Sequence, residues 1–415
     1  MSRRPPPRHA KTSAPGLVTG IYVPRAADAA ASAMTTYGVP LLVLATTGSP
    51  VLTGLAFALE WLPRLGAFAA AGTLVDRYGA ARVFRLAALA RALVVMTAAF
   101  VLAASAEGPT GTVTVMVLAA VSGVATECTF IASETAGGAA SRLAGGRAHR
   151  VQSVLMAIDQ TAILAGPAAA GLLLHWRGPV GMLSILVGLS LLGTVLVPRH
   201  KTDTAITSAA SVAGGLRTGW STLRSLPALA WLVGGLVLSN FAAGLLQAAM
   251  PIIIVTDLGR SSTDAGLIWS TAAVASLLAI TATRTAIDRW GLWAVGAVAA
   301  TIAATATLAV SQAHTYSGYL LLIAVLMAGE GGMVVVLRTL RSQLIPADVF
   351  GSTLSVTALL LLAPFPAAGL LVAAVPPDHL SHAITGAAIL QALGLAMAFT
   401  RLRTLPGLRV PARHP

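Results

Sequence analysis

Ionisable side chains inside long apolar stretches are the residues of this sequence with the clearest capacity for chemistry. In hydrocarbon such a side chain costs a few kcal/mol, so each one needs a partner or a function. Carboxyl groups predominate, which suits a site for a cation or for protons. A carboxyl group in a low-dielectric cavity has a raised pKa and can load and release a proton near neutral pH. These side chains are Arg25, Asp28, Glu60, Arg64, Arg91, Glu127, Glu134, Asp159 and Glu330.

Two oppositely charged pairs have the spacing of neighbours on one helix face. Arg25 and Asp28 are three residues apart, and Glu60 and Arg64 are four apart. Each pair could neutralise itself and so allow its helix to enter the membrane. Alternatively, each carboxylate could serve transport, and the sequence leaves both interpretations open.

The remaining carboxylates have no such neighbour. Glu127 and Glu134 are seven residues apart, two turns along one helix face, and Glu134 could also mark a membrane boundary. Because two carboxylates on one stripe do not neutralise each other, they predict a watery cavity or a bound cation. Asp159 lies in mid-helix, seven residues before Gly166-Pro167.

Glu330 is surrounded by three glycines in Gly329-Glu330-Gly331-Gly332. Glycines permit close backbone approach, so we expect its carboxyl group to face a cavity. The alternative is a flexible helix break around a satisfied carboxyl group. Asn240 and Gln247, seven residues apart, could hydrogen-bond a substrate or hold helices together.

Composition and the apolar runs predict the elements that position these residues. The chain has 415 residues, 56% hydrophobic and 10% charged, against about 25% charged in soluble domains. We therefore expect an all-α polytopic membrane protein with twelve transmembrane helices in two pseudo-symmetric six-helix halves. The expected helices are 24–46, 51–74, 84–105, 111–135, 151–174, 178–197, 227–255, 263–283, 292–312, 317–337, 350–374 and 380–400.

Hydrophilic segments then divide the chain into five parts. A basic, proline-rich tail covers 1–23, and a second tail covers 401–415. The six-helix halves are 24–197 and 227–400, joined by a linker at 198–226.

Positive charge is distributed unevenly between the two ends of these helices. Arginines gather in the tails, the linker and the breaks after even-numbered helices, whereas the opposite breaks hold only Arg177 and Arg260. The positive-inside rule then predicts that both termini are cytoplasmic. This clustering also argues against nucleic acid as the partner of a chain with net charge +13. The Ala- and Arg-rich composition suggests a high-GC bacterial genome. We expect a multi-pass protein of the bacterial inner membrane that acts as a monomer.

A charged motif after the second helix has a weaker copy in the second half. The first is Gly72-Thr-Leu-Val-Asp76-Arg77-Tyr78-Gly79-Ala-Ala-Arg82, and the second is Asp288-Arg289-Trp290-Gly291. We expect Asp76 to meet the positive N-terminal end of a helix from the other half, with Arg77 and Arg82 bridging. The expected cytoplasmic gate is Gly72, Asp76, Arg77, Gly79, Arg82, Asp288 and Arg289.

Proline-containing elements recur at corresponding places in the fifth and eleventh helices. Gly166-Pro167 lies in the fifth, and Pro364 lies in the eleventh. Proline inside a helix frees a carbonyl group and bends the helix. We expect Gly166, Pro167 and Pro364 to mark kinks in moving helices.

The motif around Asp76 resembles the signature of the major facilitator superfamily, Gly-x-x-x-Asp-Arg-x-Gly-x-Arg-Arg/Lys. The chain supplies Gly72, Asp76, Arg77 and Gly79, with Ala81 where a basic residue is usual and Arg82 following. The resemblance implies an alternating-access transporter with a central cavity between its halves. Gly166-Pro167 is similar to an element associated with exporters and antiporters in that family.

A weaker resemblance joins the chain to the ferroportin branch of the superfamily. It rests on Arg25-Ala-Ala-Asp28 and Ile158-Asp159-Gln160. It implies Asp28 as a metal ligand, although Ser32 stands where a histidine would strengthen the match. No histidine lies deep in an expected helix, so no dedicated metal site is expected unless this branch is the right one.

These observations favour a secondary active transporter over an enzyme. Nucleotide-binding, metalloprotease and nucleophile-elbow motifs are absent from the sequence, and no cofactor is expected. The expected function is proton-coupled efflux of a small organic molecule, a drug-like compound or a siderophore, by antiport with protons. The alternative is a ferroportin-like exporter of a divalent metal.

Overall fold

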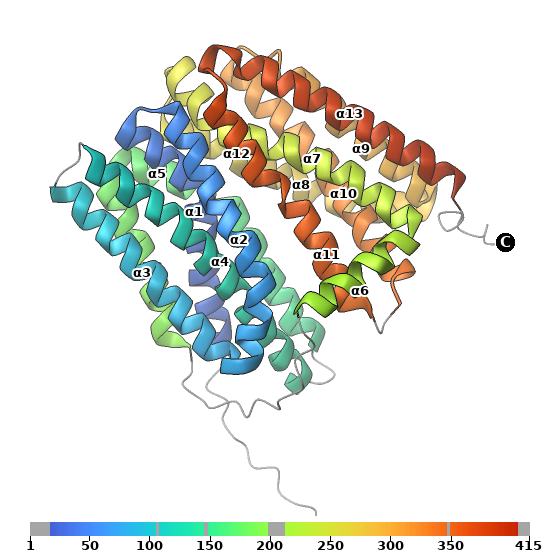
Figure 1. Cartoon of the computed structure of the whole chain (residues 1–415), viewed down its shortest axis with the longest axis horizontal. Coiled ribbons are helices and arrows are strands. Elements are labelled where there is room, and N and C mark those ends of the chain that lie inside the picture. Colours follow the sequence, from blue (N-terminus) through green and yellow to red (C-terminus); the bar gives the residue numbers. More distant parts are fainter. Residues whose placement is uncertain (1–16, 105–107, 145–147, 198–211, 347–348, 406–415) are drawn as a thin grey trace, which may run out of the picture.

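The computed structural model describes residues 17–104, 108–144, 148–197, 212–346 and 349–405, and these residues contain helices and no strand (Figure 1). Parts of the predicted tails and linker, namely 1–16, 198–211 and 406–415, lie outside the described residues. The first half comprises η1 (Val18–Tyr22), α1 (Val23–Thr47), α2 (Pro50–Tyr78), α3 (Ala80–Ala104), α4 (Pro109–Ala144) and α5 (Ala148–Leu196). After it come α6 (Val212–Ser225), α7 (Pro227–Pro251), η3 (Ile252–Asp257), α8 (Ser262–Trp290), α9 (Leu292–Val310), α10 (Tyr316–Leu344), α11 (Phe350–Leu362), α12 (Pro364–Ala374), η5 (Pro377–His379) and α13 (Leu380–Thr404).

Twelve membrane crossings follow from these helices. The described residues form 11 apolar helical stretches long enough to cross a membrane. The longest, Arg150–Leu196, contains a non-helical residue, Gly178, with φ 67° and ψ −175°. Glycine adopts positive φ without the cost that a Cβ would impose, so the chain reverses there and crosses twice. The predicted all-α fold of twelve crossings is confirmed.

The eleventh crossing is broken at the predicted proline. Helix α11 ends at Leu362, and α12 begins at Pro364. The Asn240 side chain in α7 donates a hydrogen bond to the Leu361 carbonyl oxygen, 2.7 Å away. A polar side chain of a neighbouring helix thus satisfies a backbone group beside the break, as hydrocarbon surroundings require. Asn240 therefore holds helices together in this structure.

The two halves meet along α5–α8 and along α2–α12. Glycines allow the second contact: a Cβ at Gly54 would lie 2.8 Å from the Gly369 carbonyl oxygen, and a Cβ at Gly369 would lie 2.7 Å from the Ala58 nitrogen. In the first contact, a Cβ at Gly266 would overlap the Pro167 carbonyl group. Both proline-containing elements therefore lie where the halves pack against each other.

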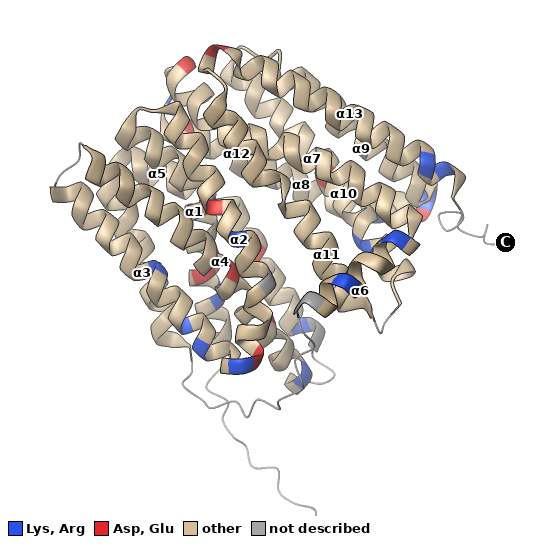
Figure 2. Cartoon of the chain, in the orientation of Figure 1, with Lys and Arg blue, Asp and Glu red and all other residues tan. Residues whose placement is uncertain are grey.

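Arginines mark one end of the helices, which we call the arginine-rich end. Arg77, Arg82, Arg284 and Arg289 are exposed there, and Figure 2 shows basic residues gathered at one end of each half. Helix α6 lies at this end in Figure 1 and packs against α11. The glycine contacts that join the halves, by contrast, lie toward the opposite end of the helices.

Substituting Gly123 with alanine is expected to destabilise the first half by about 1–3 kcal/mol. A Cβ at Gly123 in α4 would overlap the Glu60 carbonyl oxygen in α2, so the two helices would have to separate. Thermal unfolding of the purified variant measures the effect. Gly72→Ala is the matched control, because its Cβ would meet nothing within 4 Å and alanine favours helix by about 1 kcal/mol. Equal stability of the two variants would contradict the close α2–α4 packing.

Candidate functional site

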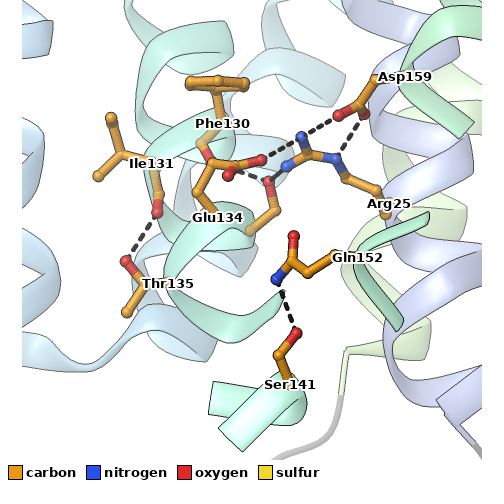
Figure 3. A network of polar contacts seen from close by, with 9 residues as sticks. Arg25, Phe130, Ile131, Glu134, Thr135, Ser141, Gln152 and Asp159 are labelled. Carbon is orange, nitrogen blue, oxygen red and sulfur yellow. Dashed lines mark hydrogen bonds and ion pairs between the residues drawn. The ribbon is translucent and has the colours of Figure 1, made fainter. Parts of the chain in front are cut away.

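Arg25 is the centre of a polar network in the first half (Figure 3). Its guanidinium group donates two hydrogen bonds to the Asp159 carboxylate, at 2.7 and 2.6 Å, and one to Glu134 at 2.6 Å. It also donates to the Ser133 hydroxyl group and lies 5.3 Å from the centre of the Phe130 ring. Helices α1, α4 and α5 are joined by this one side chain.

A second arginine holds Asp28. The Arg91 guanidinium group in α3 lies 2.5 Å from an Asp28 carboxylate oxygen, and both side chains are buried. Arg91 also donates to the hydroxyl groups of Ser32 and Ser190. The position beside Asp28 that a metal ion would take therefore holds a guanidinium group. Within the described residues, no group of three metal-ligating side chains occurs.

A third ion pair connects α2 and α4 and continues toward the other half. Arg64 lies 2.7 Å from the Glu127 carboxylate and 4.4 Å from the centre of the Trp61 ring. Trp61 in turn stacks on Phe365 of α12, with ring centres 4.3 Å apart. The ion pair thus supports an aromatic contact between the halves.

These pairings correct two expectations from the sequence. Arg25 pairs with Asp159 and Glu134, and Arg64 pairs with Glu127, so the arginines bond across helices instead of to a neighbour on their own helix. The sequence predicts water or a cation beside the stripe of Glu127 and Glu134, because neither residue has an arginine neighbour on its own helix face. Each of the two carboxylates has an arginine from another helix instead.

Glu60 differs from these four paired carboxylates. Glu60 is 1% exposed, and neither carboxylate oxygen has a hydrogen-bond partner among the residues that the structure describes. Arg64, one turn away, is bonded to Glu127, and the Thr36 hydroxyl group of α1 is close to Glu60. A buried carboxylate without a bonded cation is costly, so this group is suited to binding a proton.

Glu330 occupies a comparable place in the second half. It is 7% exposed, and among the described residues no basic side chain forms an ion pair with it. The Ser239 hydroxyl group of α7 donates to its carboxylate, and Gln391 of α13 donates to Ser239 at 2.8 Å. The surrounding glycines bring α10 close to α8, where a Cβ at Gly331 would lie 2.7 Å from the Ser276 carbonyl oxygen. Glu330 is therefore a second buried carboxyl group whose partners are neutral.

Aromatic side chains close the space between the halves near these groups. Tyr37 of α1 and Trp269 of α8 have ring centres 5.7 Å apart. Gln247, with these two rings, lines a cavity of about 10 Å³, close to the minimum volume for one water. Of the two amides predicted to contact substrate, Gln247 thus faces the junction of the halves, whereas Asn240 bonds to backbone.

The predicted gate residues lie apart from this junction. Asp76, Arg77 and Arg82 are exposed at the arginine-rich end, and the ion pairs of the described residues do not include Asp76 or Asp288. Gly79 and the equivalent Gly291 both have φ 83°, so the two motif copies share one backbone geometry. Among the described residues, Asp76 forms no ion pair with a helix of the other half in this arrangement. The gate function stays a prediction.

Asp76→Asn is expected to slow transport severalfold without unfolding the protein. The side chain is exposed, so its charge is not needed in the arrangement seen here, but it is expected to stabilise closure of the arginine-rich end. Transport rates in reconstituted vesicles measure the effect. Unchanged transport rates would contradict a gate at Asp76.

The site and the fold together define a multi-pass membrane transport protein built from two six-helix halves. Residues 26–369 match the Major Facilitator Superfamily, and the chain belongs to this family. The match covers most of the sequence, whereas no curated protein sequence matches the chain.

Several solved structures share the fold. A mutant of the nucleoside transporter NupG is 10% identical, with a TM-score of 0.73 over 91% of this chain and 99% of that one. A bacterial metal transporter is 16% identical, with a TM-score of 0.68 over 92% and 97% of the two chains. A bacterial homologue of the iron transporter ferroportin, in an inward-facing state, is 17% identical, with a TM-score of 0.69 over 92% and 98%.

Proposed function

We propose that the protein is a secondary active transporter that exports a small organic molecule, such as a drug-like compound or a siderophore, in exchange for protons. It acts as a monomer in a bacterial inner membrane by alternating access. The arginine-rich end is then cytoplasmic, as the positive-inside rule requires, and both termini lie on that side.

Buried acids without an ion-pair partner, one in each half, carry this proposal. Glu60 and Glu330 are buried, and no basic side chain among the described residues forms an ion pair with either, whereas Asp28, Glu127 and Asp159 each have one. A carboxylate bonded to an arginine would give up an ion pair in binding a proton, so it is less suited to cycling one. An acid with neutral neighbours can bind a proton when water reaches it and release the proton when the opposite side opens.

The direction of transport rests on the Gly166-Pro167 element. A Cβ at Gly166 would meet Ala33 of α1, and the Pro167 carbonyl group packs on Gly266 of α8. The element therefore lies where the two halves are in contact. Its similarity to an element of exporters and antiporters is the reason for proposing export by proton antiport.

Metal export is the less favoured alternative. Two structures of similar fold are a bacterial metal transporter and a ferroportin homologue, which is the reason for considering it. Asp28, the residue that this alternative requires as a ligand, is bonded to Arg91 at 2.5 Å. A metal ion would have to displace a buried guanidinium group.

Everted membrane vesicles with an imposed pH gradient test the proposal. A panel of drug-like compounds and siderophores is added, and collapse of the gradient is followed with a pH-sensitive dye. Glu330→Gln is expected to remove most of the collapse caused by a transported compound, because the amide cannot exchange a proton. The same panel used for growth of a deletion strain identifies the compound.

Glu134→Gln is the matched control, since that carboxyl group is half exposed and one of two bonded to Arg25. Gradient collapse in the Glu330→Gln variant equal to that of the native protein would contradict a proton-carrying role for Glu330. Collapse driven by divalent metal ions instead of organic compounds would favour the alternative.

A further inference from the structure

A groove lies between α8 and α9 on the second half, with α10 as its floor. Its volume is about 320 Å³, and it is open along one side. Its lining is apolar except for Thr283 and includes Ala279, Ala286, Trp290, Val298, Ile302 and Gly332. Val298 is 60% exposed, so the groove opens onto the outer surface of the helix bundle.

The length and position of the groove match one leaflet of a bilayer. From Ala279 to Trp290 the wall spans twelve residues of α8, and the rise between the first and the last is about 16 Å. The hydrocarbon core of a bilayer is about 30 Å thick, so one leaflet occupies about 15 Å. The groove starts at Trp290, the last residue of α8 at the arginine-rich end, and runs along α8 as far as Ala279. An apolar groove that stays empty loses dispersion contacts. On the outer surface of a membrane protein, the molecules available to fill such a groove are lipids.

A positive charge stands at the mouth of the groove. The Arg289 guanidinium group lies 5.7 Å from the centre of the Trp290 ring, which lines the groove. Arg289 takes part in none of the ion pairs among the described residues. A guanidinium group held against a ring is oriented by it, and its N–H groups can still donate to a phosphate.

Arginine–tryptophan pairs recur at the same end of the second half. Arg401 lies 5.6 Å from the Trp231 ring, and Arg403 lies 5.6 Å from the Trp293 ring. Tryptophan favours the boundary between hydrocarbon and lipid headgroups. We therefore infer that the lipid headgroups lie at the same height along the helices as the mouth of the groove.

We propose that this groove binds one acyl chain of an anionic phospholipid whose phosphate group is held by Arg289. The chain packs on α8, α9 and the glycines of α10, and the phosphate lies beside Trp290. The occupant is a bilayer lipid at a fixed site, and the inference does not depend on what the protein transports.

Native mass spectrometry of the purified full-length protein, titrated with phosphatidylglycerol or phosphatidylethanolamine, tests this site. The native protein should retain one phosphatidylglycerol molecule more tightly than the next ones. Arg289→Gln should weaken that first binding step about fivefold and abolish the preference over phosphatidylethanolamine. Val298→Trp, which fills the groove from an exposed position, should remove the tight step for both lipids.

Two exposed positions on α8 outside the groove lining supply the controls. Arg284→Gln removes a positive charge of the same helix, and Leu278→Trp adds an indole ring at a residue that is 64% exposed. Both should bind phosphatidylglycerol as the native protein does. Ala286→Leu fills the groove a second way if Val298→Trp does not purify as a folded monomer. Binding by Arg289→Gln and the filled variants equal to that of the controls would overturn the proposal.

Discussion

Replacing Glu60 with glutamine is expected to reduce pH-gradient-driven export to the level of protein-free vesicles. Glutamine has the size of the native side chain, so the α2–α4 packing at Gly123 is preserved. It cannot bind or release a proton, so a gradient can no longer drive the cycle. Export from proteoliposomes with an imposed pH gradient measures the loss. Exchange of labelled for unlabelled substrate without a gradient should persist, because it needs no net proton movement.

Glu134→Gln separates a proton-carrying role from a general effect of removing a carboxylate. The Glu134 side chain is 53% exposed, and Asp159 remains to pair with Arg25 when Glu134 is neutralised. We therefore expect this variant to retain gradient-driven export. Full gradient-driven export by Glu60→Gln, or equal loss in both variants, would contradict the assignment of Glu60.

Replacing Arg91 with methionine is expected to destabilise the protein by about 3–5 kcal/mol. The variant leaves the Asp28 carboxylate buried without its cation, and Ser32 and Ser190 lose a hydrogen-bond donor. Thermal or denaturant unfolding in detergent measures the change.

The double variant Asp28→Asn with Arg91→Met is the informative control. It removes both charges, so most of the lost stability should return. If Asp28 were instead a metal ligand and Arg91 had a separate role, the losses of stability caused by the two substitutions would add instead of compensating each other. Additive losses would therefore contradict the ion pair as the reason why both residues lie in the membrane.

The fold could be predicted from the sequence because membrane helices have a strong one-dimensional signal. Charge-free runs of about 20 residues locate the crossings, and Gly178 and Pro364 mark interruptions that the structure places at a chain reversal and a helix break. The two copies of the charged motif, found as a repeat in the sequence, also share a backbone geometry, since Gly79 and Gly291 have the same φ. The apolar pattern did not show that residues 212–225 of the predicted linker form helix α6.

The partners of the buried charges could not be predicted, because a sequence shows which residues share a helix face but not which helices are neighbours. Arg25 and Asp28 have the spacing of an ion pair on one helix. In the structure, however, Arg25 pairs with Asp159 of α5, and Asp28 pairs with Arg91 of α3. For Glu330, the sequence did indicate that a cationic partner is missing. No Lys or Arg occurs between residues 290 and 329, so the helices next to Glu330 in the sequence offer no cation to pair with it.

Infrared difference spectroscopy of the purified protein tests most directly whether Glu60 and Glu330 carry protons. When the pH is lowered, each protonated carboxyl group gains a C=O absorption band in a region free of amide signals. We predict a titrating band that Glu60→Gln removes and a second that Glu330→Gln removes, with both bands unchanged in Glu127→Gln. Absence of such bands, or their persistence in the Glu60 and Glu330 variants, would contradict the account.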